Sequence, residues 1–434
     1  MKTKTFYAII LMVCSMPLFS QNIEDYLSRY QYQQAIDYLE QTNDTSKVAE
    51  MQKVLCYNYL QNYPKAIEIL LNLQEKYPED MQIKMQLALC YNKLSMLQES
   101  ITYFDDLIKM DSANTYFKIQ RADFLYQAGK YDQALAQYKY AFDEYNSLNL
   151  VKQIAFCYEK TSQWDSAKVY FNQVLRMDST DQKSKEEIIK IDINQENYIP
   201  ALLNSVKFLA GDTNNIPLNT LQALCFYYLE DFKNAIETLE KCVQLGDTSV
   251  VVNKYLGVSY FYSKQDKNAY PYLIKAYDQD TTNVSVLYAL ATVNKNLENF
   301  PEAIRLYEKL LQKLIPPYSA LHTYYKNLAE SYTENKEIQP AIENYKKALI
   351  YFSDYQDIEL LFLIADLYDL YVRDYELAID YYKRYRERLL DYQQFMKKQD
   401  NVNKATIADI SDKIKYLDER IVYLEKKMEK LQSY

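Results

Sequence analysis

The side chains that most often carry enzymatic chemistry are scarce in this sequence. A single histidine, His322, would have to supply any imidazole acid–base catalysis or histidine-based metal site. Adjacent carboxylates occur at Asp105-Asp106 and Glu186-Glu187, but lysines stand near both pairs, and we expect solvated helix surfaces there. Four glycines in the whole chain are too few for a phosphate-binding loop or a nucleophile elbow. We therefore expect no enzyme, no cofactor and no metal site, with His322 on the surface.

One repeating pattern predicts the elements that would position any site. Small residues recur at intervals of 31 to 38 residues, most of them 33 or 34. They are Ala35, Ala66, Ser100, Ala134, Ala167, Ala201, Ala235, Ala269, Ala303, Ala341 and Ala378. A bulky residue stands three positions before all of them but one, where Asp266 takes its place. A period near 34 is typical of helix-turn-helix arrays, in which a small side chain lets two helices approach closely.

A second stripe of small residues stands twelve positions before the first. Its members are Ala88, Ala122, Ala155, Ala223, Gly257, Ala291 and Ala329. Two helical stripes in each period, separated by a turn, predict an antiparallel helix pair. We expect each residue of the second stripe to lie opposite its partner in the first, so that the two stripes mark the closest contact within a pair.

This pattern resembles the tetratricopeptide repeat. Leu256-Gly257 with Tyr260, and the run from Gly129 to Ala134, are similar to the family's signature. The resemblance covers about residues 22–390 and implies an all-α, right-handed superhelical solenoid of about eleven repeats. The proline that closes the family's repeat is clear only at Pro78. Elsewhere an Asp-Ser or Asp-Thr pair stands there, and we expect its oxygens to cap the next helix. These pairs begin at Asp111, Asp178, Asp212, Asp247 and Asp280.

Residues 1–20 have the pattern of a secretory signal peptide. Lys2 and Lys4 precede an apolar run from Phe6 to Val13, and a breaking segment ends at Ser20. We expect cleavage between Ser20 and Gln21, which makes the mature chain an exported protein of the periplasm or cell envelope. Residues 21–390 would then be the solenoid, irregular near 314–321, where two prolines follow one another.

Residues 391–434 are expected to form a long helix beyond the repeats. Apolar residues alternate there at spacings of three and four, which is a heptad seam. The seam consists of Ile407, Ile410, Ile414, Leu417, Ile421, Leu424, Met428 and Leu431. Such a stripe is costly to leave in water. It either folds back as a cap over the open end around Leu360, Leu363, Leu367 and Tyr371, or pairs with a second chain in a homodimer. Both alternatives stay open.

Five cysteines follow the expected leader, namely Cys56, Cys90, Cys157, Cys225 and Cys242. An odd number in an exported chain raises the question of disulfides. Three of them share one position in the first helix of alternate repeats, and helices that far apart are about 16–20 Å from each other. A disulfide needs Cα atoms roughly 5.5 Å apart. We expect all five to be buried free thiols.

Charge limits the kinds of partner. The formal net charge is −9, and it becomes more negative when the two lysines of the leader are removed. Nucleic acid and anionic lipid both need clustered cations, so neither is an expected partner. Beyond the leader, no apolar run reaches the about 18 residues of a membrane span, and we expect no stable membrane insertion.

The resemblance also indicates where a partner would bind. In the family, the first helix of each repeat lines the concave face, and its positions 2, 5, 9, 12 and 13 point into the groove. Carried onto this register, these positions give an aromatic cluster in repeats seven to nine. Its residues are Tyr227, Tyr228, Lys254, Phe261, Tyr262 and Tyr288. The cluster is either ordinary filling between helices or a binding site built from amphipathic rings.

These observations favour a non-catalytic scaffold or adaptor that mediates protein–protein interactions in a bacterial cell envelope. Its groove would hold an envelope protein or peptide. The alternative is glycan binding, in which concave tyrosines stack on sugar rings. Family members that capture sugars at the outer membrane carry long non-helical insertions and a lipid anchor, and this sequence resembles them less.

Overall fold

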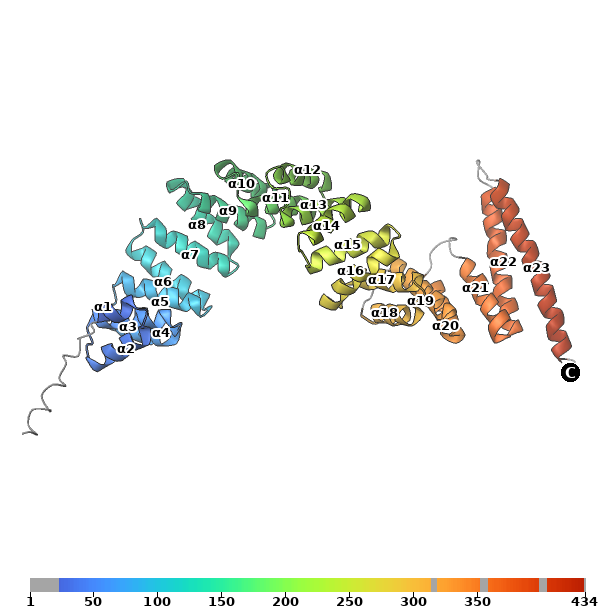
Figure 1. Cartoon of the computed structure of the whole chain (residues 1–434), viewed down its shortest axis with the longest axis horizontal. Helices are drawn as coiled ribbons and strands as arrows, with labels where there is room; N and C mark the ends of the chain where they lie inside the picture. The colour runs from blue at the N-terminus through green and yellow to red at the C-terminus, as the bar shows by residue number, and fades with distance from the viewer. Residues whose placement is uncertain (1–22, 314–317, 352–357, 398–403, 433–434) are drawn as a thin grey trace, which may run out of the picture. The chain divides into compact units, whose positions relative to one another are not determined.

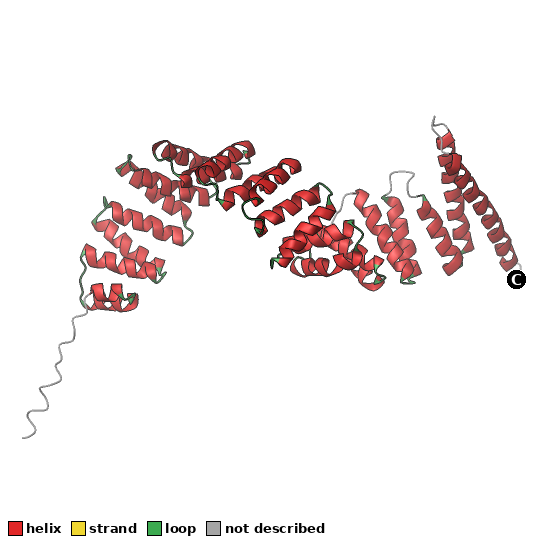
Figure 2. Ribbon diagram, turned by 45° about the horizontal axis from the view of Figure 1, so that its top comes forward, coloured by secondary structure: helices red, strands yellow, loops and turns green. Residues whose placement is uncertain are grey.

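A computed structural model describes residues 23–313, 318–351, 358–397 and 404–432. Within these ranges all regular structure is helical, with 23 α-helices and one π-helix (Figure 2). The chain divides into two compact units, Met1–Ile191 and Asp192–Tyr434. The expected signal peptide and the two consecutive prolines lie outside the described residues. None of the described helices has the length and hydrophobicity that a membrane span requires.

Helices follow one another along each unit (Figure 1). The first unit contains α1 (Ile23–Ser28), α2 (Tyr32–Gln41), α3 (Lys47–Tyr59), α4 (Tyr63–Lys76), α5 (Met81–Lys93), α6 (Leu97–Met110), α7 (Thr115–Gln127), α8 (Tyr131–Glu144), α9 (Leu148–Lys160) and α10 (Trp164–Met177). The boundary between the units falls within α11 (Gln182–Asn194). The second unit continues with α12 (Tyr198–Leu209), α13 (Ile216–Tyr228), α14 (Phe232–Gln244), α15 (Val250–Tyr262), α16 (Asp266–Gln279), α17 (Val284–Asn296), α18 (Phe300–Lys313), α19 (Tyr318–Glu334) and α20 (Ile338–Ile350). It ends with α21 (Glu359–Asp366), the π-helix η2 (Leu367–Val372), α22 (Tyr375–Lys397) and α23 (Lys404–Gln432).

Each odd-numbered helix pairs with the even-numbered helix that follows it. Every even-numbered helix from α2 to α22 begins three residues before a small residue of the first stripe, at the position where the bulky residue stands. All eleven small residues, from Ala35 to Ala378, have a relative exposure of 0 %. The expected all-α array of helix pairs, ending in a long C-terminal helix, is confirmed.

The turn inside each pair has one conformation throughout. The residue two positions before each even-numbered helix has a positive φ, between 57° and 64° in ten pairs and 74° at Gly129. In ten pairs the next N–H donates to a carbonyl five residues back, as Asp231 N does to Phe226 O at 2.9 Å, and in the last pair Asp374 N donates to Tyr368 O, six residues back. This is the Schellman motif, which ends a helix with one left-handed residue. Only Gly129 is a glycine, so ten side chains occupy a strained backbone conformation.

The expected capping by Asp-Ser and Asp-Thr pairs is wrong in detail. The aspartate carboxylate instead accepts from the N–H two residues later, as Asp212 does from Asn214 at 3.1 Å and Asp280 from Thr282 at 2.9 Å. This closes a local turn and brings a later residue to the helix start. Asn215 then caps α13 by accepting from Leu218 N, and Asn283 likewise caps α17.

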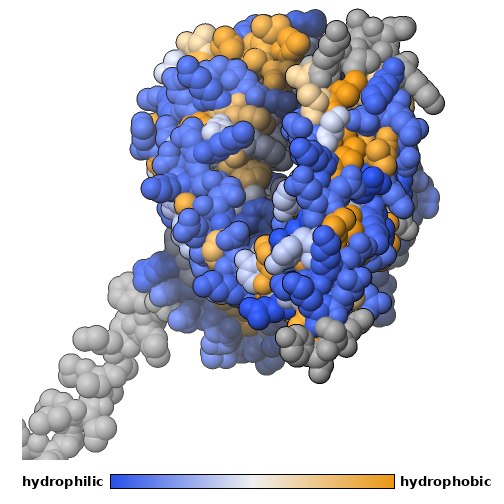
Figure 3. Space-filling view, turned by 90° about the vertical axis from the view of Figure 1, so that its right-hand side faces the viewer, coloured by the Kyte–Doolittle hydropathy of each residue, from blue (hydrophilic) through white to orange (hydrophobic). Residues whose placement is uncertain are grey.

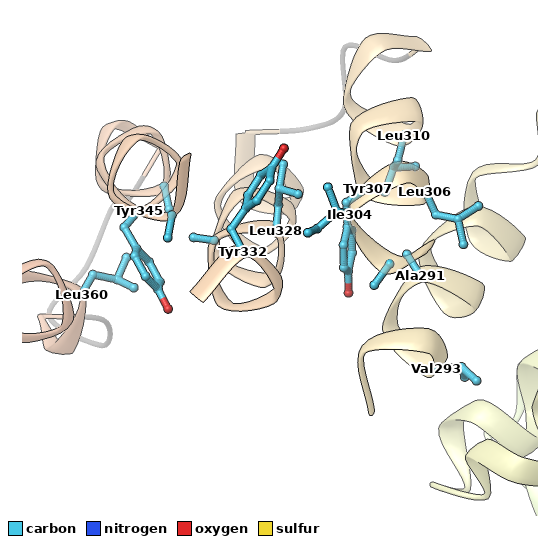
Figure 4. Packing of buried hydrophobic residues seen from close by; sticks show 14 of the residues in the cluster. Ala291, Val293, Ile304, Leu306, Tyr307, Leu310, Leu328, Tyr332, Tyr345 and Leu360 are labelled. Atoms are coloured by element: carbon cyan, nitrogen blue, oxygen red, sulfur yellow. The ribbon is translucent and has the colours of Figure 1, made fainter. Parts of the chain in front are cut away.

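The second unit has a continuous apolar core between its helices. Leu328 and Tyr332 of α19 lie between Tyr307 of α18 and Tyr345 of α20 in the close view of Figure 4. Tyr307 and Tyr345 are both almost fully buried. Large aromatic side chains thus fill the space between helix pairs, while the small residues lie where the helices of one pair touch. In the first unit a similar core includes Leu70 and Leu87.

The last pair contains an extra residue in its first helix. The π-helix η2 follows α21, and the fully buried small residue there is Ala365, thirteen rather than twelve positions before Ala378. A π-helix inserts one residue into the turn, which accounts for the shifted register. It also points Asp369 into the interior, where its carboxylate is 4 % exposed.

The C-terminal helix packs against its own chain. Ile410, Leu417, Ile421 and Leu424 of the seam are buried in the same core as Leu360. The guanidinium of Arg420 pairs with the Asp369 carboxylate at 2.6 Å. Two details differ from expectation: α22 continues to Lys397, past residue 390, and Tyr371 is 60 % exposed rather than covered. The apolar seam is therefore largely occupied within one chain.

Candidate partner-binding surface

The six residues expected to form a binding site lie on three odd-numbered helices of the second unit. Tyr227 and Tyr228 end α13, Phe261 and Tyr262 end α15, which also carries Lys254, and Tyr288 belongs to α17. Tyr228 is 39 % exposed and Tyr262 is 51 % exposed, whereas the other four are half-buried. The expected cluster therefore has two side chains that a partner could reach freely and four that are partly enclosed.

The structure joins these rings through direct contacts. Tyr227 and Tyr228 meet edge to face, with ring centroids 5.4 Å apart. Tyr262 touches Phe261 at 5.2 Å, and Phe261 meets the Tyr288 ring edge to face at 6.0 Å. Edge-to-face pairs of this kind are stabilising beyond the area they bury. The rings form one connected surface and not separate exposed positions.

Four aromatic residues that the sequence reasoning missed complete this surface. Tyr198 stacks on Tyr228 at 5.1 Å, and Phe232 stacks on Tyr262 at 5.0 Å. Tyr198 and Phe232 begin α12 and α14, and each stacks on the last residue of the odd-numbered helix in the next pair, α13 or α15. Tyr255 contacts Tyr227 at 4.9 Å, and Tyr324 contacts Tyr288 at 5.1 Å. We call the ten residues together the aromatic surface: Tyr198, Tyr227, Tyr228, Phe232, Lys254, Tyr255, Phe261, Tyr262, Tyr288 and Tyr324.

Hydroxyl and ammonium groups give the aromatic surface its polar character. The hydroxyl oxygens of Tyr228 and Tyr255 are 3.0 Å apart and share a hydrogen bond. The Lys254 ammonium lies 4.8 Å from the centroid of the Tyr255 ring, within range of a cation–π interaction. Burial raises the pKa of Tyr227 to about 12, so its phenol stays protonated. The hydroxyl can therefore donate a hydrogen bond as well as accept one.

No acidic residue belongs to the three helices that carry the expected site. α13, α15 and α17 contain neither aspartate nor glutamate, in a chain with 59 acidic residues. Their only charged side chains are Lys254 and Lys295. The ammonium of Lys295 is held by Glu330 of α19 and by Asn327, 3.0 Å away. Within the described residues, Lys254 forms no ion pair, and its ammonium lies over the Tyr255 ring instead.

A depression lies in the first unit, between α3 and α5. It has a volume of about 410 Å³ and is lined by Val48, Met51, Leu55, Gln82 and Gln86 among others. Val48 and Leu55 are exposed, and with Met51 they occupy the same register positions that point into the groove in the resemblance. Sequence reasoning overlooked this depression because it followed tyrosines and not aliphatic residues. Figure 3 shows one face of the molecule, mainly hydrophilic with separate hydrophobic patches.

The residues considered for catalysis are engaged in structural contacts. His322 is half-buried, not a surface residue, and its Nδ1 lies 3.0 Å from the carbonyl oxygen of Ala348. Glu187 is also buried, contrary to expectation. The ammonium groups of Lys183 and Lys190 pair with its carboxylate at 2.6 and 3.1 Å and compensate for its charge. Within the described part of the chain, no cluster of histidine, cysteine or carboxylate side chains could hold a metal ion.

The five cysteines of the described residues are buried, and none forms a disulfide. Burial raises the pKa of Cys56 and Cys90 to about 11, and of Cys157 and Cys225 to about 12. At neutral pH these groups are therefore thiols and not nucleophilic thiolates.

Two segments of the chain match family models described as the tetratricopeptide repeat. One covers residues 57–115 in the first unit, and the other covers residues 216–245 in the second. The second match includes Tyr227 and Tyr228, and both matches contain helix pairs with the register described above.

Curated proteins and solved structures are also similar to this chain. A BBSome complex member from Bos taurus is 24% identical over 251 residues, which are 57% of this chain and 46% of that protein. A tetratricopeptide-repeat-containing protein of Methanocaldococcus jannaschii is 29% identical over 87 residues, 19% of this chain and 27% of that one. The matches thus span less than half the length of both relatives. The crystal structure of the C-terminal part of such a protein from Cytophaga hutchinsonii has a TM-score of 0.44 and 22% identity, over 56% of this chain and 99% of that one.

The family matches fall on two stretches of an array whose eleven helix pairs share one register of buried small residues and one turn conformation. The chain therefore contains tetratricopeptide repeats at residues 57–115 and 216–245, and its other helix pairs share their register.

Proposed function

We propose that this protein is a non-catalytic scaffold that binds another protein through the aromatic surface, and that it works in the bacterial cell envelope. The observation that carries the proposal is the connected run of rings from Tyr198 to Tyr324, with Tyr228 and Tyr262 accessible. Tyrosine-rich, partly desolvated patches supply much of the binding energy at protein interfaces. The leader-like residues 1–20 support export.

The ring contacts favour a protein ligand over a glycan. Sugar rings stack on exposed aromatic faces, whereas one face of Tyr228 is covered by Tyr198, and one face of Tyr262 is covered by Phe232. The aromatic surface therefore presents mainly ring edges and hydroxyl groups to a ligand. A polypeptide offers carbonyl groups to those hydroxyls and side chains to the spaces between the rings.

Affinity capture tests the proposed binding. The mature chain, immobilised, should retain a protein from an envelope extract, and the double variant Tyr228→Ala with Tyr262→Ala should lose it. Tyr59→Ala is a matched control, because Tyr59 is exposed, occupies the same register position as Tyr228 in α3, and stacks on Tyr32 at 4.5 Å. Undiminished capture by the double variant contradicts the proposal, provided that its helicity and melting temperature equal those of the control.

Export has its own test. Intact mass of the protein recovered from a bacterial periplasmic fraction should correspond to a chain that begins at Gln21. Recovery of the complete chain, Met1 included, from the cytoplasm alone would refute the envelope location while leaving the binding proposal intact.

A further inference from the structure

Every polar group of the aromatic surface can donate a hydrogen bond: the tyrosine hydroxyls donate and also accept, and the Lys254 ammonium only donates. Tyr228, Tyr255 and Tyr262 provide hydroxyl groups, and Lys254 provides an ammonium. The hydrogen bond between Tyr228 and Tyr255 uses one of their two protons and leaves the other free to donate outward. No carboxylate on α13, α15 or α17 competes for these donors. A ligand that brings hydrogen-bond acceptors therefore complements this surface.

Charge excludes a strongly acidic ligand as the best fit. Lys295 is paired with Glu330, and hydrogen bonds from Thr282 and, to a smaller extent, the charge of Lys254 lower the pKa of Asp280, so Lys254 already interacts with a carboxylate. A peptide rich in carboxylates would therefore find about one cation and would leave its other charges without partners. The acceptors that suit this surface are uncharged.

The arrangement of the rings favours compact, rigid apolar groups. Tyr227 lies nearly perpendicular to Tyr228, at 79°, and to Tyr255, at 76°, and Phe261 is perpendicular to Tyr288, at 86°. Alternating faces and edges create a corrugated apolar surface. Flat pyrrolidine rings fit against such aromatic ridges, and proline-rich segments bind to aromatic-lined surfaces for this reason.

We propose, resting on the proposed function, that the partner segment bound by the aromatic surface is proline-rich and extended in the polyproline II conformation. This conformation has no internal hydrogen bonds, so its backbone carbonyls are free to accept from Tyr228, Tyr262 and Lys254. Proline has no N–H, which matches a surface without carboxylates on these helices. An α-helical segment would fit less well, because its carbonyls are already bonded within the helix. The preformed conformation also lowers the entropic cost of binding.

Fluorescence anisotropy with labelled ten-residue peptides tests this inference on the full mature chain. Polyproline should bind, whereas a glycine-serine peptide and a glutamate-rich peptide should bind at least tenfold more weakly. Tyr228→Phe with Tyr262→Phe keeps both rings and removes only the hydroxyl donors, and should weaken polyproline binding at least tenfold. The control Tyr59→Phe should change nothing, and circular dichroism should be the same for all three proteins.

Three results would overturn the inference. Tighter binding of the glutamate-rich peptide would assign the aromatic surface to acidic ligands. Equal binding of polyproline by wild type and the phenylalanine variant would mean that the hydroxyls do not recognise it. Absence of polyproline binding, while capture from envelope extract still depends on Tyr228 and Tyr262, would reject the ligand class and leave the scaffold function standing. If that capture is absent too, both proposals fail.

Discussion

The hydroxyl of Ser100 donates a 2.7 Å hydrogen bond to the carbonyl oxygen of Ala88, twelve residues earlier. Ser100 lies on α6 and Ala88 on α5, and both are fully buried. A side chain of one helix can reach the backbone of its neighbour only where the two helices nearly touch. The two stripes of small residues seen in the sequence therefore mark a real contact, and Ser100 is accepted there because its hydroxyl has a partner.

Ala235→Leu should destabilise the array, because Ala235 occupies the equivalent contact between α13 and α14 and has no exposed surface. Added side-chain volume at such a contact costs about 1–3 kcal/mol of unfolding free energy. Urea unfolding followed by circular dichroism measures it. Glu237→Leu, on the exposed face of α14, is the control and should be nearly neutral. Equal stability of the two variants would mean that the register is wrong.

Gly257→Ala should also destabilise, although glycine to alanine inside a helix normally stabilises by roughly 0.5–1 kcal/mol. A Cβ on Gly257 would lie 2.9 Å from Leu273 Cγ and 3.0 Å from the Leu273 backbone N, so α15 and α16 would have to separate. Gly211→Ala, in the turn after α12, is the control for a glycine substitution without a steric clash, because nothing lies within 4 Å of its Cβ position. If Gly257→Ala raises the melting temperature as much as the control does, the contact between α15 and α16 can accommodate an additional methyl group.

Glu230→Gly should stabilise the protein. Glu230 lies in the turn between α13 and α14 and has a φ of 59°. This left-handed conformation costs an L-residue roughly 1 kcal/mol and costs glycine little. The gain should be about 0.5–1 kcal/mol in urea unfolding. Glu237→Gly, inside α14, should instead lose about 1 kcal/mol. If both substitutions destabilise to the same extent, the glutamate side chain contributes a contact that outweighs the strain of the turn.

The helix pairs could be predicted from the sequence because a single physical constraint repeats eleven times. Only a small side chain fits where two helices touch, and each even-numbered helix begins three residues before it. The turn conformation was less visible, since ten left-handed positions carry residues such as Tyr30 and Glu230 and not glycine. The π-helix could not be foreseen either, because it depends on packing around Asp369 and leaves no local signature.

The site was predicted only in part. The register gave Tyr228 and Tyr262 on successive odd-numbered helices, but it could not say that Tyr198 and Phe232 would stack on them. Those contacts join the end of one helix to the start of another in the neighbouring pair, and a helix-by-helix reading does not follow them. The absence of acidic residues from α13, α15 and α17 was present in the sequence and would have pointed to the same place.

The five cysteines should not react with thiol reagents while the protein is folded. Burial raises the pKa of Cys157 and Cys225 to about 12, so the reactive thiolate is scarce at pH 8, and the side chains are also inaccessible. Ellman's reagent should report almost no thiol in the native mature protein and five after denaturation in guanidinium. Four or more sulfurs that remain unreactive in denaturant, but are released by a reductant, would instead reveal disulfides.

Arg420→Ala should loosen the C-terminal helix. Removal of the guanidinium leaves the Asp369 carboxylate buried without its cation, beside Asp366, which accepts from the same Tyr382 hydroxyl. Loss of one partner of a buried ion pair costs roughly 3 kcal/mol when the other stays charged, at the low end of the usual range because Arg420 is itself partly exposed. Arg386→Ala removes an exposed pair with Asp418, which joins α22 to α23, and should cost less than about 1 kcal/mol.

The double variant Asp369→Asn with Arg420→Met distinguishes an unpaired charge from lost packing. It leaves no buried charge, so it should recover most of the stability lost in Arg420→Ala.

Sedimentation of the same proteins addresses the alternative of a homodimer. With Ile410, Leu417, Ile421 and Leu424 buried in their own chain, the mature protein should be a monomer at tens of micromolar, and Arg420→Ala should self-associate as the seam becomes available. A wild-type dimer that Arg420→Ala converts into a stable monomer would show that the seam joins two chains and that Arg420 acts at their interface.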